Sequence, residues 1–174
     1  MSSLRENVDT STSWGKLEYT DWRDENMSWK QTCYIGDWSY LDEVHVKGPG
    51  ALQFFSDHVI NSLEKFDIGQ AKHAVFCNKA GKIIGEGILQ RLGEEEFEFQ
   101  ARGPVANWIE YRLETGGYDA TVETTLGKFK FQVSGPNALA VCEAATGGPL
   151  RDIGFMRFRS SLIAGVDVLF LRQG

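Results

Sequence analysis

The chain has 174 residues, of which 42% are hydrophobic and 24% charged, proportions that are ordinary for a globular protein with a sizeable core. A formal net charge of −6 argues against a surface that binds nucleic acid or an anionic membrane. We expect a cytoplasmic protein, because no apolar run approaches the ~18 residues of a membrane span and no signal peptide opens the chain. We expect no metal site, because the three cysteines and three histidines are scattered along the sequence.

The first forty residues are predicted to hold a lead-in, a helix and a turn. Residues 1–15 are rich in serine, threonine, asparagine and aspartate, which is typical of a flexible segment. A helix is expected over residues 22–33, with Trp22 and Trp29 on one stripe. Because tryptophans at helical spacing are more often core than ligand platform, we expect the stripe to be buried. Residues 34–40 are predicted to form an aromatic turn.

A strand, a Gly-Pro pair and a helix follow one another twice in the chain. Residues 46–52 (VKGPGAL) return as residues 133–139 (VSGPNAL), and a looser version surrounds the Gly-Pro pair at 103–104. Proline is favoured in the first turn of a helix, where its missing N–H would have no partner in any event. The helices expected after the three pairs are residues 50–63, a helix that ends at 116–117, and residues 135–145.

Short apolar runs with alternating polarity predict strands. Residues 72–101 contain three such runs separated by Asn/Gly turns, which indicates an antiparallel meander. Further strands are expected at 41–47, at 118–124 and 128–134 around a turn at 126–127, and at 162–171. Together these elements predict an α+β fold: antiparallel sheets with helices packed on one face, and a duplicated strand–Gly-Pro–helix unit.

The middle strand of the meander carries an unusual residue. Alternation places Ile84, Glu86 and Ile88 on one face, so that a carboxylate lies between two isoleucines, and Gly85 and Gly87 flank it. Glycine weakens a strand unless a bulge, a ligand or another backbone comes close. Two interpretations follow: a solvated glutamate on an edge strand, or a carboxylate at the floor of a ligand pocket.

Several motifs occur in a recognisable order. They are GDWS at 36–39, the two Gly-Pro motifs, GQA at 69–71 and NKAGKIIGE at 78–86. With them the chain resembles, over about residues 21–172, the glycine-cleavage T-protein (aminomethyltransferase) superfamily of tetrahydrofolate-dependent one-carbon transferases. YTDWRD at 19–24, NW at 107–108 and GGPL at 147–150 look most like the branch of tetrahydrofolate-dependent aromatic O-demethylases.

The resemblance implies roles for individual residues. Glu86 falls on the family's catalytic aspartate, which faces the reactive nitrogen of folate; a carboxylate there stabilises a developing cation and can accept a proton. His73 stands where a folate-pocket tyrosine is common, and Tyr40 where a histidine is common. The remaining positions assigned to folate binding are Asn78, Gly85, Gly87 and Gln100.

The resemblance also implies a function for the chain. Residues 16–174 are expected to be the amino-terminal portion of a tetrahydrofolate-dependent methyl or aminomethyl transferase, incomplete for catalysis by itself, whose small-molecule donor is a methoxy-aromatic or a methylamine. One alternative is a non-catalytic folate-binding module acting in assembly or cofactor maintenance, which a reactive cysteine would indicate. Another is an oligomeric scaffold. We also expect self-association through the C-terminal strand, whose apolar residues and open edge invite pairing.

Overall fold

The structure of the chain is a computed structural model that describes residues 11–12, 15–16, 19–125 and 128–174. Within these residues the helices are α1 (Trp22–Gln31), α2 (Ala51–His58), α3 (Gly103–Gly116) and α4 (Ala138–Thr146). The strands are β1 (Ser11–Thr12), β2 (Gly15–Lys16), β3 (Tyr34–Asp37), β4 (Asp42–Lys47), β5 (Ala71–Cys77), β6 (Ile83–Arg91), β7 (Glu96–Ala101), β8 (Thr121–Thr125), β9 (Phe131–Ser134), β10 (Phe158–Ile163) and β11 (Val166–Leu171).

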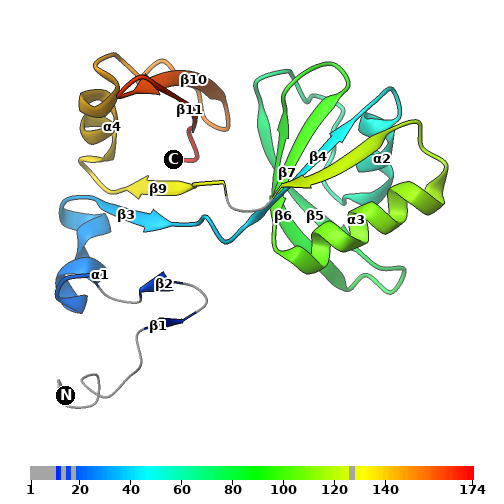
Figure 1. Ribbon diagram of the computed structural model, residues 1–174, viewed down its shortest axis with the longest axis horizontal. Coiled ribbons are helices and arrows are strands. Elements are labelled where there is room, and N and C mark those ends of the chain that lie inside the picture. Colours follow the sequence, from blue (N-terminus) through cyan, green and yellow to red (C-terminus); the bar gives the residue numbers. More distant parts are fainter. Residues whose placement is uncertain (1–10, 13–14, 17–18, 126–127) are drawn as a thin grey trace.

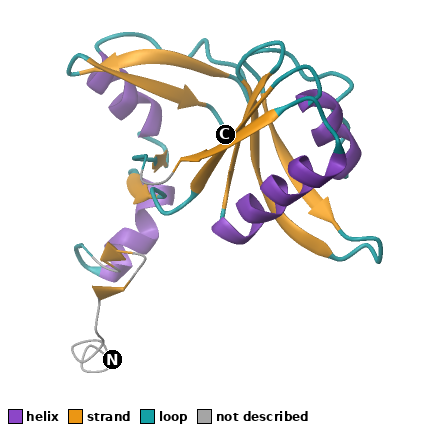
Figure 2. Cartoon of the chain, turned by 45° about the vertical axis from the view of Figure 1, so that its right-hand side comes forward, coloured by secondary structure: helices purple, strands orange, loops and turns teal. Residues whose placement is uncertain are grey.

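The largest sheet has five strands in the order β5-β6-β7-β4-β8, and every neighbouring pair is antiparallel. The meander predicted over residues 72–101 is confirmed as β5, β6 and β7. Helices α2 and α3 lie together on one face of this sheet (Figure 1, Figure 2). The predicted α+β fold with helices on one sheet face is therefore confirmed.

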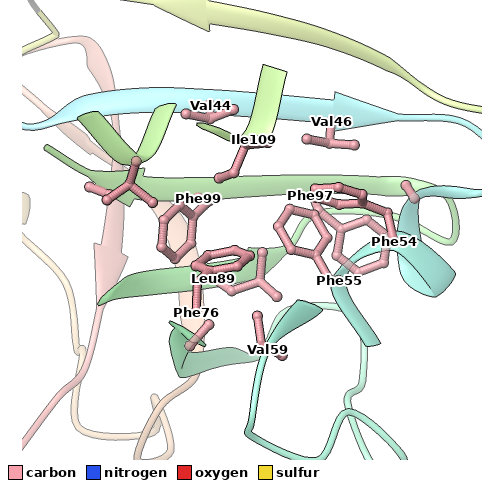
Figure 3. Close-up of a cluster of buried hydrophobic side chains, with 14 of the residues drawn as sticks. Val44, Val46, Phe54, Phe55, Val59, Phe76, Leu89, Phe97, Phe99 and Ile109 are labelled. Carbon is pink, nitrogen blue, oxygen red and sulfur yellow. The ribbon is translucent and has the colours of Figure 1, made fainter. Parts of the chain in front are cut away.

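A phenylalanine-rich core lies between that face and the two helices (Figure 3). Phe55 of α2 contacts Phe97 and Phe99 of β7, with ring centroids 5.7 and 6.5 Å apart. All three rings are fully buried. Truncating one buried Phe to Ala typically costs about 3–5 kcal/mol, so this cluster accounts for much of the stability of the sheet. Because side chains alternate along a strand, the polar residues of these strands lie on the opposite, helix-free face.

The duplicated Gly-Pro unit is also confirmed. Gly48, between β4 and α2, has φ 138°, and Gly135, between β9 and α4, has φ 134°. A Cβ at Gly48 would lie 2.6 Å from the Asp119 carbonyl oxygen, and one at Gly135 would lie 2.7 Å from that of Thr32. Both glycines are thus required by the backbone conformation and by a close backbone approach.

Helix α2 ends earlier than predicted. The expected helix over residues 50–63 stops at His58, because Val59 is extended (φ −97°, ψ 147°) and forms an isolated bridge with Phe76 at the end of β5. Leu63 remains buried beyond the helix, so the apolar pattern marked core positions correctly but not their secondary structure.

The five-stranded sheet with α2 and α3 forms the first lobe, at the right of Figure 1. The second lobe, at the left, contains two two-stranded sheets, β3-β9 and β10-β11. The predicted turn over residues 34–40 is wrong in its first half, where β3 forms and pairs with β9. The strands predicted on either side of residues 126–127 do form, but β8 joins the large sheet and β9 joins β3; the turn itself lies outside the described residues.

The single strand predicted over residues 162–171 is wrong. The chain reverses at Ala164 (φ 50°) and Gly165 (φ 83°), and β10 and β11 form an antiparallel hairpin. Positive φ at both central residues is the geometry of a type I′ turn, whose twist matches that of paired strands.

The predicted burial of the tryptophan stripe on α1 is wrong as well. No residue of α1 is buried, and Trp29 is 52% exposed. Helical spacing shows that residues share a face, but not whether another element covers that face. Asp21 caps the helix by accepting the backbone N–H of Arg23 at 2.8 Å.

The expected lead-in over residues 1–15 falls mostly outside the described residues; β1 and β2, in and just after it, pair as a small antiparallel ladder. None of the described helices has the length and apolar character needed to cross a membrane.

Candidate functional site

The candidate site lies on the helix-free face of the five-stranded sheet, which we call the open face. Cross-strand partners share a face, so the register decides which side chains meet there. Val75 of β5 is opposite Glu86 of β6, and His73 is opposite Ile88. Ile88 is in turn opposite Gln100 of β7. The register therefore brings Glu86, His73 and Gln100 onto one surface.

Glu86 and His73 form the central pair of this surface. The distance from His73 Nε2 to Glu86 Oε2 is 3.4 Å, and the two side chains remain 54% (His73) and 58% (Glu86) exposed. A carboxylate beside an imidazole can accept and return a proton near neutral pH. Both residues were expected in the site from the sequence, and the structure brings them together.

The two glycines that flank Glu86 face the other way, towards the helices. A Cβ at Gly85 would lie 2.0 Å from Val105 Cγ2 of α3, and one at Gly87 would lie 2.1 Å from the Gln100 backbone oxygen. Close packing of α3 and β7 against β6 thus requires both glycines. Their expected contact with folate remains a prediction, and packing by itself accounts for their identity.

The predicted face of β6 needs one correction. The register of β5 and β6 shifts between Phe76 and Cys77, and Ile84 packs against the buried core instead of lying on the open face beside Glu86. A β-bulge changes which side chains share a face, and periodicity alone does not reveal it.

Gln100 belongs to a hydrogen-bonded set of charged residues. Its Nε2 donates to Glu98 Oε1 at 3.1 Å. Lys128 Nζ lies 2.5 Å from Glu43 Oε2 and 3.5 Å from Glu98 Oε2, and Lys130 Nζ lies 3.1 Å from Glu43 Oε1. The pKa of Lys128 is raised, and the largest cause is its hydrogen bond with Glu43. Desolvation of the lysine opposes this effect, and the charge of Glu98 adds to it.

Sequence reasoning missed this charged set. Glu43 and Glu98 are buried, at 5% and 9% exposure. A signal for these buried glutamates was present in the sequence, because each lies within a strand beside apolar residues. Glu43 precedes Val44 in β4, and Glu98 lies between two phenylalanines in β7. A second imidazole–carboxylate pair was missed too: His45 Nε2 lies 2.9 Å from Glu96 Oε1.

Tyr40 and Asn78 lie towards the margins. Tyr40 precedes β4, and its ring centroid is 5.7 Å from that of Trp38. Asn78 Oδ1 accepts the backbone N–H groups of Ala80 and Lys82 at 2.9 and 3.0 Å, so this oxygen is used in the β5–β6 turn. A role for either residue in folate binding remains a prediction.

The described residues contain no group of three or more His, Cys, Asp or Glu side chains suited to a metal ion. All three cysteines are free and partly exposed, not buried. Burial, ahead of the nearby Cys33, raises the pKa of the Cys142 thiol, which lowers its nucleophilic thiolate fraction at neutral pH. No observation on this thiol favours a reactive cysteine.

The open face of this α+β domain thus carries an imidazole–carboxylate pair with a hydrogen-bonding amide beside it. The family model of the GCVT N-terminal domain matches residues 13–174, and the chain belongs to this family.

Named relatives agree with this assignment. The chain is 39% identical over 162 residues to the sesamin methylene transferase of Sinomonas sp. (strain No.22), a match that covers 91% of this chain and 35% of that protein. It is 34% identical over 168 residues to the syringate O-demethylase of Sphingobium sp. (strain NBRC 103272 / SYK-6), covering 90% and 36%. An aminomethyltransferase of Exiguobacterium sibiricum is 29% identical over 156 residues, covering 87% and 43%.

A solved structure supports the fold. The glycine cleavage system aminomethyltransferase T from Bartonella henselae superposes with a TM-score of 0.67 at 27% identity, over 78% of this chain and 37% of that one. The chain thus spans between a third and a half of the length of these four proteins.

Proposed function

We propose that the chain forms the part of a tetrahydrofolate-dependent one-carbon transferase that carries the catalytic carboxylate, Glu86. The observation that supports this most directly is the Glu86–His73 pair on the open face. The transferred group is a methyl or aminomethyl unit, and the family of the chain supports this class of reaction.

The residues present fit tetrahydrofolate. The cofactor supplies a nucleophilic ring-system nitrogen that accepts the one-carbon unit. Glu86 would face that nitrogen, since its side chain is more than half exposed and carries the charge that favours a cationic centre. His73 would orient the carboxylate and hold a proton at Nε2, while the Gln100 side chain would offer hydrogen bonds beside them.

The relatives favour one donor class over another. Identity is 39% and 34% to the methylene transferase and the O-demethylase, against 29% to the aminomethyltransferase. We therefore propose a methoxy-aromatic donor ahead of a methylamine. The three free cysteines fit a reducing compartment, and we propose a cytoplasmic location.

The test is Glu86→Gln in the complete enzyme that contains this chain. The substitution keeps the side-chain shape and removes the charge, so turnover should fall at least ~100-fold, as losing an acid–base or electrostatic group does. Tetrahydrofolate affinity, followed by tryptophan fluorescence, should change little.

Glu114→Gln is the matched control. Glu114 is an exposed glutamate on α3, on the helix-covered side of the sheet, and its replacement should leave turnover unchanged. Equal turnover in the Glu86→Gln enzyme and this control would refute the assignment of Glu86.

A further inference from the structure

The segment that follows α2 extends the five-stranded sheet beyond its edge strand β5. Val59 forms an antiparallel bridge with Phe76. The Ile60 N–H donates to the Val75 carbonyl at 3.0 Å. The Val75 N–H donates in turn to the side-chain oxygen of Asn61 at 3.0 Å, so an amide side chain takes the place of a backbone carbonyl. These bonds satisfy part of the open edge of β5 and fix the backbone on both sides of Ile60.

This pairing decides which way Val59 and Ile60 point. Val59 is 8% exposed and points into the phenylalanine-rich core, opposite the buried Phe76 (Figure 3). Because successive side chains of an extended chain point to opposite faces, Ile60 lies on the open face, where it is 68% exposed. Antiparallel neighbours share a face, so Ile60 stands in one row with Val75 of β5 and Glu86 of β6.

An aliphatic surface therefore borders the Glu86–His73 pair. Val75 lies between Ile60 and Glu86 in the row, and Ile88 is opposite His73. Val75 is 9% exposed, whereas more than half of Ile60 is in contact with water. Most of the Ile60 side chain thus contributes no burial to the folded chain, and its apolar surface is available to a ligand that binds at the pair.

We propose that Ile60 is a specificity-determining residue that binds the aromatic ring of a methoxy-aromatic donor. This inference rests on the proposed function and places the donor in the same site. Two strand spacings of ~4.8 Å separate Ile60 from Glu86, a span of roughly 10 Å that accommodates one benzene ring with its substituent. A ring that lies over Val75 and against Ile60 directs its methoxy group towards Glu86.

The contact discriminates between donors through the apolar surface that each of them buries. An aromatic ring covers Ile60 and Val75, and this burial favours binding. A methylamine whose methyl group is at Glu86 is too small to reach Ile60, so it gains nothing from the isoleucine. The ring of the donor, and not the pterin of tetrahydrofolate, occupies the row, so the affinity for the cofactor is independent of Ile60.

The test is Ile60→Ser in the complete enzyme that contains this chain, with syringate as the aromatic probe and tetrahydrofolate present. The dissociation constant of syringate, followed by tryptophan fluorescence, should rise at least ~10-fold, because the aliphatic contact is lost. The KM for syringate should rise in parallel while kcat changes less than about three-fold, as expected for a residue that binds but does not react. The dissociation constant of tetrahydrofolate should stay the same.

Two variants serve as controls. Ile60→Leu keeps the aliphatic surface and should bind syringate as the unmodified enzyme does. Ile68→Ser removes an isoleucine that is 51% exposed and precedes β5, outside the row, and it should change neither dissociation constant. Because both isoleucines are more than half exposed, the midpoints of urea unfolding should match that of the unmodified enzyme.

Three results would overturn the inference. They are no binding of syringate to the unmodified enzyme, equal syringate constants in Ile60→Ser and Ile68→Ser, and a loss of tetrahydrofolate affinity in place of syringate affinity. The last result would assign Ile60 to the cofactor. Failure of the proposed function has a different signature, because Glu86→Gln would then keep full turnover. Weaker syringate binding in Ile60→Ser beside a fully active Glu86→Gln enzyme would support the aromatic contact and refute the catalytic carboxylate.

Discussion

At the residue scale, the Glu86–His73 pair has more to do with chemistry than with stability. Its 3.4 Å contact joins two side chains that are each more than half exposed. Exposed ion pairs contribute about 0–1 kcal/mol, because water screens them and two side chains must be ordered. A pair that adds so little to folding, on an open polar face, is available to a ligand.

This separation of chemistry from stability gives a prediction for His73→Ala. The free energy of unfolding, measured in urea, should change by less than ~1 kcal/mol. Transfer activity of the complete enzyme should fall at least ~10-fold, because Glu86 loses the group that orients it and shares its proton.

His73→Gln is the informative second variant, since it restores a hydrogen bond without restoring an acid–base group. Activity should stay low if proton exchange matters and should recover if orientation alone matters. Unchanged activity in His73→Ala would show that the imidazole is only a surface residue.

At the element scale, the two faces of β6 have different roles. One face carries Glu86 towards solvent, and the other carries Gly85 and Gly87 against α3 and β7. Absence of a side chain at these two positions lets α3 and β7 approach, and this close packing holds the strand that presents the carboxylate.

Gly87→Ala should therefore destabilise the protein. The new methyl group would lie 2.1 Å from the Gln100 backbone oxygen and 2.7 Å from Phe99 Cζ. Overpacking of this kind costs about 1–3 kcal/mol, and we expect the upper end because backbone yields little. The midpoint of urea unfolding measures it.

Gly148→Ala provides the comparison, since a methyl group at this position would meet nothing within 4 Å and the φ of Gly148 is not in the left-handed region. It should change stability by no more than ~0.5 kcal/mol. Equal effects of the two substitutions would mean that β6 can shift away from β7 without loss.

The segment that leads into β9 is attached to the open face by charge. Lys130 is 12% exposed and Lys128 is 53% exposed, and both contact the buried Glu43. Lys130 also donates to the Leu41 carbonyl at 2.7 Å. Two cations around one buried carboxylate connect this segment to the large sheet.

Lys130→Met should destabilise the chain more than Lys128→Met, in urea unfolding at neutral pH. Removing the buried partner of a buried charge costs about 3–5 kcal/mol, whereas the exposed lysine is screened by water and contributes ~1 kcal/mol or less. A larger loss of stability from Lys128→Met would show that the exposure of the lysine does not determine which of the two contacts stabilises the chain more.

The Lys128 contact also has a pH signature. The pKa of Lys128 is raised above its ordinary value of 10.5, so the stability it contributes is complete below that value and is lost as the pH rises through the raised pKa. The free energy of unfolding, measured by chemical unfolding, should therefore fall less at alkaline pH in the Lys128→Met variant than in the unmodified chain.

At the scale of the whole molecule, the two lobes differ in how well their apolar residues are covered. The large sheet has a sealed aromatic core, whereas Leu162, Val166 and Leu169 of the β10–β11 hairpin are 52%, 64% and 41% exposed. Exposed apolar strands with open edges tend to pair with other strands.

We therefore expect the 174-residue chain to self-associate through the C-terminal hairpin. Light scattering after size exclusion should show a mass that rises with concentration. Val166→Lys, a charge on β11, should return the chain to a monomer. Lys substituted for exposed Ile68, outside the hairpin, should not. A monomer at all concentrations would refute this expectation.

What the sequence by itself determined was local. Alternation predicted the three strands of the meander, the Gly-Pro pairs predicted that a helix follows each of them, and a carboxylate between two glycines singled out Glu86. These features depend on a few adjacent residues, whose φ/ψ limits and side-chain periodicity operate in any context.

Tertiary structure alone decided the rest. Pairing of His73 with Glu86 depends on the register of β5 and β6, and the exposure of Trp29 depends on what covers α1. The separation of β8 and β9 into different sheets, and the burial of Glu43 beside two lysines, likewise join segments far apart in the chain. Such contacts are determined by the total burial and hydrogen bonding of the folded molecule, which cannot be read from any short stretch of sequence.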